Sequence, residues 1–395
     1  MSREMARIVL DKVVITLFRP IHIEIRGFPA YNAPMNKTTI ILHDYLQHKG
    51  GGERLVLTLA RALASKLVVG FRTPGSFDPK DFGVECVELG HEVDYPGFRY
   101  LAIQWWFKRR TKFLADYDSV IFSANCIQAA AQCRPDARTI FYCHTPIRNA
   151  YDLYEFYLAR MPWWKAIAYR LFCALIRFNY ERDLKHIDVI VANSKTIQER
   201  IKTYLKRDSV IVYPPIDTKK FSWLGQGDYY LSYSRVDLVK RVTEIAEAFK
   251  QMPDKKLIIA STGTEVERLK AIIKDVPNVQ YVGRVDDAEL ARLVGNCIAN
   301  IYIPKDEDFG MTVLEGMAAG KPCLGVAEGG LRETIDHEKD GYLLPANPSI
   351  ADIKRGVEYL SPARSMEMKM VCQKKANQFR EEVFVEKMKA MIEQD

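Results

Sequence analysis

Residues 307–322, EDFGMTVLEGMAAGKP, connect two short apolar runs in the second half of the chain. The run before them covers residues 299–303, and the run after them covers residues 322–326; both read as strands. Gly310 lies in the connecting loop, and the residues from Met311 onward have a helical pattern. A strand, a loop, a helix and a further strand in this order are typical of a parallel α/β unit.

The same order of elements is found in both halves of the chain. Residues 38–43 read as a strand, residues 50–52 as a glycine turn and residues 55–63 as a helix. Other apolar runs alternate with helical segments, as in doubly wound α/β folds. These runs are residues 67–69, 119–122, 140–142 and 189–192 in the first half, and 229–234, 256–261 and 279–282 in the second.

Two prolines divide the chain into domains. Pro214 and Pro215 lack backbone donors and favour an extended conformation, so regular structure is expected to stop there. We therefore predict two Rossmann-like domains facing a central cleft, which is the expected active site. The predicted segments are an N-terminal extension, loosely packed or disordered (1–36), a first Rossmann-like domain (37–213), a second Rossmann-like domain (214–378) and a C-terminal helix crossing back to the first domain (379–395).

The net charge of +7 is unevenly distributed along the sequence. Residues 37–215 carry a charge of +8, the residues before them +2 and the residues after them −3. Such a distribution predicts that one domain faces anionic lipid, phosphate or polymer. A solvated basic surface without such a partner is the alternative. No nucleic acid partner is expected.

The cysteines and the apolar runs indicate a protein of a reducing compartment. The eight cysteines have neither a C-x-x-C pair nor zinc-like spacing, which favours buried thiols. We expect no signal peptide, because the apolar run at 13–18 is soon followed by a proline and charges. No uncharged run is long enough to span a bilayer. The expected location is the cytoplasm, with peripheral contact to the inner membrane leaflet.

Residues 307–322 also suggest a ligand site. Glu307 is expected in the loop, where Gly310 lets the backbone approach a ligand. The helix that starts at Met311 could receive a diphosphate at its N-terminus, because unpaired amides and the helix dipole favour anions. Glu315 lies one turn further on and would accept hydrogen bonds from sugar hydroxyls. Two solvated glutamates on a helix are the alternative.

The two glutamates, separated by seven residues, resemble the E-x(7)-E signature of retaining glycosyltransferases of family 4, which have the GT-B fold. Family enzymes usually begin this signature with E-G-F-G, and Asp308 replaces the first glycine here. This variant is similar to that of mannosyltransferases of bacterial O-antigen and exopolysaccharide assembly. The resemblance extends from about residue 37 to the C-terminus, and it implies that residues 37–213 form the acceptor domain and residues 214–378 the nucleotide-sugar donor domain.

Two motifs of the first half agree with this resemblance. Residues 50–54, GGGER, match the G-G-x-E-R loop of the family, whose glycines, here Gly51 and Gly52, let the backbone approach the donor. Residues 142–146, YCHTP, look like the family's histidine motif, which implies that His144 contacts the transferred sugar. A glycine turn and a buried histidine without a ligand are the alternatives.

Two motifs of the second half complete the resemblance. Residues 234–241, SRVDLVKR, resemble the donor-phosphate motif, in which Arg235 and Lys240 would neutralise the leaving diphosphate. Arg284 follows a strand in the position that borders the nucleotide base in the family. The resemblance implies the catalytic residues His144, Glu307, Arg235 and Lys240. It implies a donor site made of Gly51, Gly52, Arg235, Lys240, Arg284, Phe309, Gly310, Met311, Thr312 and Glu315.

The implied reaction is front-face substitution without a cofactor or a metal ion. Cationic side chains would take the place of magnesium at the leaving diphosphate, while Glu315 would hold the ribose. Residues 116–118, DYD, spell the D-x-D of metal-dependent transferases, but they directly precede an apolar strand, which argues against a metal site. The nucleotide sugar is the substrate, with GDP-mannose favoured and UDP-sugars left open.

Two segments combine tryptophan with basic residues. Residues 98–113 and 160–178 both have a composition that suits a lipid interface. Amphipathic helices with one buried face are the alternative. We expect a polyprenyl-diphosphate-linked glycan as acceptor.

Other functions need other motifs. A nucleotide-dependent dehydrogenase would have G-x-G-x-x-G after the first strand, and residues 50–55 lack it. A P-loop enzyme would have G-x-x-x-x-G-K-[ST], and residues 316–321 are one residue short of it. A sugar-nucleotide epimerase or a catalytically silent binding subunit with the GT-B fold remains as the alternative.

Overall fold

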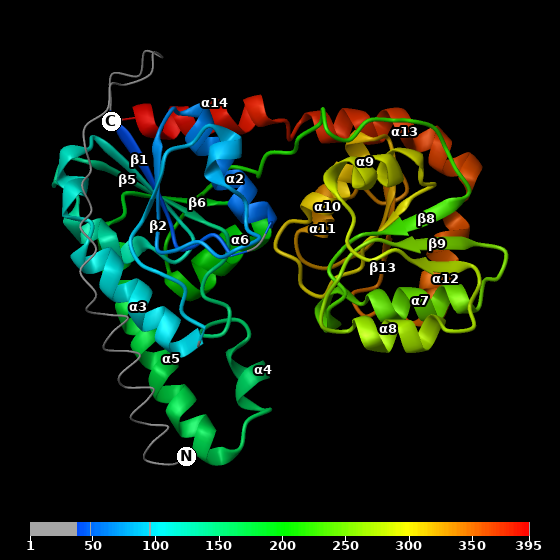
Figure 1. Cartoon of the computed structure of the whole chain (residues 1–395), viewed down its shortest axis with the longest axis horizontal. Helices are drawn as coiled ribbons and strands as arrows, with labels where there is room; N and C mark the ends of the chain where they lie inside the picture. Colours follow the sequence, from blue (N-terminus) through cyan, green and yellow to red (C-terminus); the bar gives the residue numbers. More distant parts are fainter. Residues whose placement is uncertain (1–37, 48, 95, 395) are drawn as a thin grey trace. The chain divides into compact units, whose positions relative to one another are not determined.

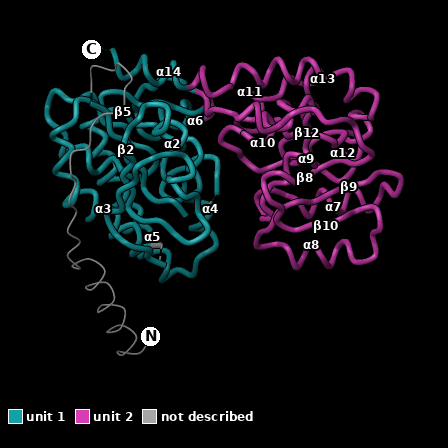
Figure 2. The backbone as a smooth tube through the Cα atoms, turned by 45° about the horizontal axis from the view of Figure 1, so that its top comes forward, with its two compact units in different colours: residues 1–193, 197–212, 385–395 teal, residues 194–196, 213–384 magenta. Residues whose placement is uncertain are grey.

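The computed structural model describes residues 38–47, 49–94 and 96–394, which form two compact units (Figure 2). Unit 1 contains the chain up to Asn193, Ile197–Val212 and Val385–Asp395. Unit 2 contains Ser194–Thr196 and Tyr213–Phe384. The predicted N-terminal extension, residues 1–36, lies outside the described residues.

Unit 1 is built on a seven-stranded parallel sheet with the order β3-β2-β1-β4-β5-β6-β7. Its central strands are rich in β-branched and aromatic residues, and nearly all of their residues are buried on both faces of the sheet, as is typical of parallel sheets. The strands are β1 (Thr39–His43), β2 (Lys66–Val69), β3 (Cys86–Glu88), β4 (Ser119–Ser123), β5 (Arg138–Cys143), β6 (Val189–Ala192) and β7 (Val210–Ile211).

Most helices of unit 1 lie around its sheet (Figure 1). The helices of this unit are α2 (Gly51–Ala62), α3 (Pro96–Arg109), α4 (Tyr154–Leu158), α5 (Trp163–Asp183), most of α6 (Lys195–Arg200) and the part of α14 (Glu381–Glu393) that follows Phe384. The end of α14 is held to β5 by Arg138, whose Nε donates to the carbonyl of Met391 at 3.4 Å. No helix within the described part of the chain is long and apolar enough to cross a membrane.

Unit 2 has a six-stranded parallel sheet with the order β10-β9-β8-β11-β12-β13. Its strands are β8 (Tyr229–Ser232), β9 (Lys256–Ile259), β10 (Val279–Tyr281), β11 (Asn300–Ile301), β12 (Cys323–Val326) and β13 (Gly341–Leu344). Its helices are α7 (Val242–Lys250), α8 (Val266–Ile273), α9 (Asp287–Asn296), α10 (Met311–Ala318), α11 (Leu331–Thr334), α12 (Ile350–Tyr359) and α13 (Pro362–Asn377). The prediction of two Rossmann-like α/β domains is confirmed.

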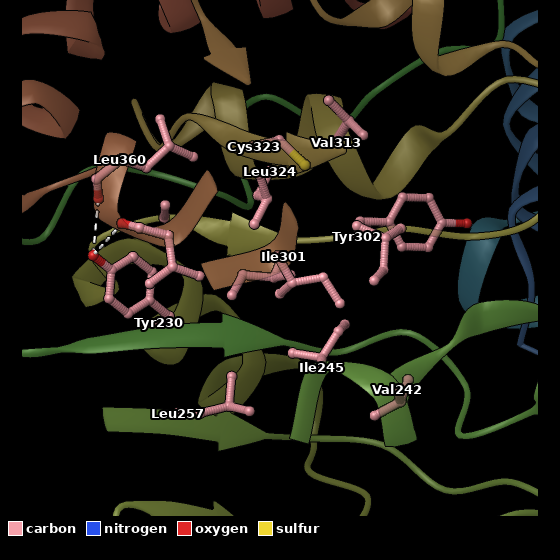
Figure 3. Packing of buried hydrophobic residues seen from close by; sticks show 14 of the residues in the cluster. Tyr230, Val242, Ile245, Leu257, Ile301, Tyr302, Val313, Cys323, Leu324 and Leu360 are labelled. Carbon is pink, nitrogen blue, oxygen red and sulfur yellow. Dashed lines mark hydrogen bonds between the residues drawn. The ribbon is translucent and has the colours of Figure 1, made fainter. Parts of the chain in front are cut away.

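The core of unit 2 lies between its sheet and the helices around it, among them α7, α10 and α12 (Figure 3). Ile245 of α7, Leu257 of β9 and Leu324 of β12 are fully buried, and burial of such a side chain contributes about 1.5–3 kcal/mol. Tyr230 keeps its hydroxyl satisfied in this apolar setting, because it donates to the carbonyls of Val357 and Leu360 at 3.2 and 2.9 Å. The last turn of α12 is thereby joined to β8.

Candidate active site

In unit 1, two histidines and a serine meet at the carboxyl ends of three neighbouring strands. His43 ends β1, Ser123 ends β4 and His144 directly follows β5, and the register pairs His43 with Ser123. The Ser123 hydroxyl lies 3.0 Å from Nδ1 of His43 and 2.9 Å from Nε2 of His144. Because one hydroxyl proton serves two ring nitrogens, the tautomers of the two histidines are coupled through Ser123.

Asp44 extends this buried network. Its Oδ1 lies 3.5 Å from Nε2 of His43 and accepts a hydrogen bond from the amide of Tyr45, while its Oδ2 accepts one from the amide of Asn125. Burial raises the pKa of Asp44 to about 6, although the two amides oppose the shift. Burial also lowers the pKa of His43 to about 4 and that of His144 to about 3. Both rings are therefore neutral at pH 7 and can each donate and accept one hydrogen bond.

The glycine loop lies against His144. A Cβ on Gly52 would come within 3.5 Å of Cε1 of His144, so this glycine keeps the approach to the ring open. Gly51 is exposed at the start of α2. The two predicted elements of the first half, the glycine loop and His144, are thus adjacent in unit 1.

Sequence reasoning missed His43, Asp44 and Ser123. Each is a polar residue in the last position of an apolar strand or directly after it. Since parallel strands present their carboxyl ends at one edge of the sheet, this shared position was the available signal.

In unit 2, Lys240 and Glu307 form a direct ion pair. Nζ of Lys240 lies 2.6 Å from Oε2 of Glu307, and both side chains are largely shielded from solvent. Nζ also donates to the hydroxyl of Tyr302 at 2.9 Å. Burial, and then the charge of Glu307, raise the pKa of Tyr302 well above its usual value, so its phenol stays protonated. The three residues bring together the loops that follow β8 and β11.

Two glycines hold the Glu307 loop in place. The amide of Gly330 donates to the carbonyl of Glu307 at 2.8 Å. A Cβ on Gly329 would lie 2.2 Å from that same carbonyl, and one on Gly330 would lie 2.4 Å from Cα of Phe309. Only glycine permits this approach. Sequence reasoning missed the pair, although Gly329 and Gly330 come shortly after the apolar run at 322–326.

The start of α10 carries the second glutamate. Gly310 has a φ of 92° directly before Met311, a conformation that favours glycine. Tyr233 follows β8 and donates to the carbonyl of Thr312 at 2.7 Å, with its hydroxyl 3.5 Å from Oε2 of Glu315. Glu315 therefore lies on the side of α10 that faces the end of β8.

The aromatic ring of Phe309 belongs to the core. Only 2% of this residue is exposed, and its ring stacks on Tyr213 at 5.4 Å and contacts Phe379 at 5.7 Å. Its side chain therefore supports the loop between Glu307 and Gly310 by packing.

The two arginines predicted for the donor site, Arg235 and Arg284, are more exposed to solvent than Lys240. Arg235 is 68% exposed and pairs with Asp237, at 3.3 Å between NH1 and Oδ2. Arg284 is exposed on the loop after β10. Among the predicted site residues of unit 2, the structure thus joins Lys240 to Glu307 directly, whereas Arg235 pairs within its own loop.

Family comparisons match nearly all of the described chain. Residues 49–220 match the family described as Glycosyltransferase Family 4, and residues 214–379 match the family described as Glycosyl transferases group 1. The boundary between the two matches falls close to the passage from unit 1 to unit 2.

Individual proteins show more distant similarity. The chain is 27% identical over 206 residues to N-acetyl-alpha-D-glucosaminyl L-malate synthase of Bacillus anthracis, an alignment covering 47% of this chain and about half (52%) of that relative. It is 25% identical over 352 residues to alpha-1,3/1,6-mannosyltransferase ALG2 of Homo sapiens, covering 76% and 82% of the two chains. The structure resembles Anabaena Alr3699/HepE in complex with UDP and glucose, with a TM-score of 0.66, 15% identity and coverage of 90% and 99%.

Proposed function

The chain is a glycosyltransferase of the GT-B type, with a family 4 domain followed by a group 1 domain, and we propose that it transfers a hexose from a nucleotide sugar to a lipid-linked glycan with retention of configuration. GDP-mannose is the donor we favour, and cell-surface polysaccharide assembly is the process. The likeness to a mannosyltransferase supports this donor, as does the Asp308 variant of the glutamate signature.

The ion pair between Lys240 and Glu307 carries the proposal. A diphosphate attracts the ammonium of Lys240, and a sugar attached to that diphosphate offers hydroxyl donors to the carboxylate of Glu307. The two groups are 2.6 Å apart, so one ligand that contains both a diphosphate and a sugar can engage both. Tyr302 limits where Nζ of Lys240 can lie, because it accepts one of its three hydrogen bonds.

In the proposed step, the bond between the anomeric carbon and the diphosphate oxygen breaks while the acceptor oxygen bonds to the same face of the sugar. The proton of the acceptor hydroxyl passes to the departing diphosphate. Negative charge grows on the leaving group, and Lys240, Arg235 and the first amides of α10 stabilise it. Glu307 orients the sugar, and Glu315 holds the ribose.

We assign His144 the contact with the transferred sugar. Its ring is neutral because burial lowers its pKa to about 3, so it adds no positive charge beside the developing cationic sugar. The Ser123 hydroxyl fixes the ring orientation.

Nucleotide binding followed by product analysis tests the proposal. Thermal-shift measurements with GDP, UDP and ADP should show stabilisation by one nucleotide, because a ligand that binds only the folded state raises the melting temperature. The matching nucleotide sugar is then incubated with a polyprenyl-diphosphate-linked glycan, and NMR of the product gives its anomeric configuration. Inversion would refute the retaining mechanism, and donor consumption without a glycosylated product would instead support an epimerase. Binding without any turnover would support a catalytically silent subunit.

A UDP-sugar is the second candidate donor. The similarity to the HepE complex with UDP and glucose favours it. The nucleotide screen separates the two candidates, since GDP and UDP differ in the base while sharing the diphosphate.

A further inference from the structure

Helix α5 exposes a row of large apolar side chains. Residues 164, 167, 171, 175 and 178 recur at intervals of three or four positions and therefore share one helix face. On the opposite face, Cys173, Ile176 and Tyr180 are buried in the core of unit 1. The α5 apolar surface is defined here as Trp163 (76% exposed), Trp164 (58%), Ile167 (52%), Leu171 (70%), Leu175 (45%) and Phe178 (66%).

Helix α3, which lies beside α5, also carries exposed apolar side chains. Helices α3 and α5 run side by side (Figure 1), with Tyr100 of α3 and Phe172 of α5 in edge contact at 5.7 Å. Phe98 and Leu101 on α3 are also exposed. A contiguous apolar surface of this kind marks an interaction site in a folded protein, whereas single exposed apolar residues are ordinary.

The two segments rich in tryptophan and basic residues differ in exposure. In α3, Trp106 and Phe107 are fully buried, so these two aromatic side chains pack in the core of unit 1 and are not available to lipid. In α5, both Trp163 and Trp164 face outward. The predicted lipid interface is therefore limited to α5 and the exposed residues of α3 beside it.

The part of α5 that carries the apolar surface has charged residues of one sign, and the exposed Glu181 lies near the C-terminal end of the helix. Residues 156–180 contain four basic residues and no Asp or Glu, and residues 95–115 contain five basic residues and no Asp or Glu. Lys165 and Arg170 are exposed on α5 itself. Nζ of Lys165 lies 5.1 Å from the ring of Trp164, an arrangement in which the aliphatic stem follows the apolar surface and the charge stays at its edge.

This charge pattern favours anionic lipid over a second copy of the chain. Two copies that met through α5 would place Lys165 and Arg170 of each at the interface, with no carboxylate from residues 156–180 to pair with them. An anionic bilayer instead offers phosphates to the cations and acyl chains to the apolar side chains.

We propose that α5 lies in the plane of an anionic membrane, with Trp163, Trp164, Leu171 and Phe178 at the boundary between headgroups and acyl chains and with Lys165 and Arg170 at lipid phosphates. The inner face of α5 stays packed on unit 1. The choice of a membrane rests on the proposed function, because that function requires a lipid-linked acceptor. An enzyme held at the bilayer meets such an acceptor by diffusion in two dimensions.

Vesicle flotation with the full-length chain tests the surface. Binding to phosphatidylcholine vesicles that contain about one third phosphatidylglycerol should exceed binding to phosphatidylcholine alone, and should fall as salt is added. The triple variant Trp163→Ser, Leu171→Ser, Phe178→Ser should bind these vesicles at least about tenfold more weakly. The variant Lys165→Glu, Arg170→Glu should lose the preference for anionic vesicles.

Matched controls come from unit 2. Met370 of α13 is 71% exposed and Lys250 of α7 is exposed, so Met370→Ser and Lys250→Glu alter similar side chains elsewhere and should bind vesicles like the unchanged chain. Nucleotide-induced thermal shifts should be equal in all variants, which separates failure of this surface from failure of the proposed function.

Equal binding to both vesicle types would overturn the proposal, as would triple-variant binding equal to that of the Met370→Ser control. Sedimentation in the absence of vesicles provides a further test. A dimer that the triple variant converts to a monomer would assign the α5 apolar surface to a second copy of the chain instead.

Discussion

Ser123 is the only hydroxyl placed between His43 and His144 in the described network, within 3.0 and 2.9 Å of their ring nitrogens. Replacing it with alanine removes the link that fixes the two tautomers. We expect Ser123→Ala to lower kcat about tenfold, in keeping with the loss of roughly one hydrogen bond in the transition state, and to leave nucleotide affinity unchanged. Steady-state kinetics and nucleotide titration measure the two effects separately.

Ser119 provides the control for this prediction. It lies at the other end of the same strand, is fully buried, and its hydroxyl has no hydrogen-bond partner among the described residues. Ser119→Ala should therefore leave kcat unchanged. A similar fall in kcat for both variants would show that the effect of Ser123→Ala is structural.

The depressed pKa of His144 predicts a dependence of stability on pH. The folded ring titrates at about 3 and the unfolded ring at 6.5, so below pH 6.5 the unfolded state binds a proton that the folded state does not. Acidification therefore destabilises the wild type relative to His144→Gln, by about 2 kcal/mol at pH 5. Urea unfolding of both proteins at pH 7 and pH 5 measures the change. A constant difference between them would contradict it.

Lys240 is predicted to bind the donor diphosphate. Lys240→Gln removes a charge-assisted hydrogen bond worth about 1.5–3 kcal/mol, so the Kd of the nucleoside diphosphate should rise about 10- to 100-fold. Calorimetric titration measures the change. The control is Lys256→Gln, which breaks the exposed ion pair with Asp228 in the same unit; such surface pairs contribute little. Equal affinities for the two variants would refute the role of Lys240.

The turn that leads into α10 depends on a glycine. Gly310 has a φ of 92°, and a Cβ there would lie 2.9 Å from Cδ1 of Leu331. Gly75 has a similar φ of 87° with no atom within 4 Å of a Cβ. Both Gly→Ala variants incur backbone strain of about 1 kcal/mol, and Gly310→Ala must also displace Leu331. Chemical unfolding should show a larger loss for Gly310→Ala, which should also weaken nucleotide binding. Equal losses would exclude the packing effect.

The strand–loop–helix units could be predicted from the sequence because their signals are local. The apolar runs, Gly310 and the helical pattern after Met311 lie within one short stretch, and α10 starts at Met311 as predicted. The His43–Ser123–His144 network could not be predicted in this way, because its residues come from three strands and are brought together only by the strand order β1-β4-β5.

Helices α3 and α5 show a second limit of sequence reasoning. Their compositions are similar, yet Trp106 is buried and Trp163 is exposed. Periodicity alone does not distinguish a face that packs on a sheet from a face that remains uncovered when both faces are apolar.

The glycosyl transfer reaction is predicted to need no divalent metal ion. Lys240 and Arg235 supply the positive charge at the diphosphate in the proposed mechanism. Asp118 of the D-x-D sequence already accepts hydrogen bonds from the amide and hydroxyl of Thr38, at 2.7 and 2.8 Å, and contacts Arg134. The glycosylation rate should therefore be unchanged by an excess of EDTA, measured by product formation. Activity that disappears in EDTA and returns with manganese would refute this mechanism.

The order of synthesis follows from the path of the chain through unit 1. Residues 385 onward belong to this unit, and Arg138 of β5 bonds to Met391 of α14. A ribosome therefore produces all of unit 2 before it delivers the last segment of unit 1, which is most of α14. While translation continues, unit 1 lacks its last helix. Unit 2 can therefore fold to completion first, although most of unit 1 is made earlier.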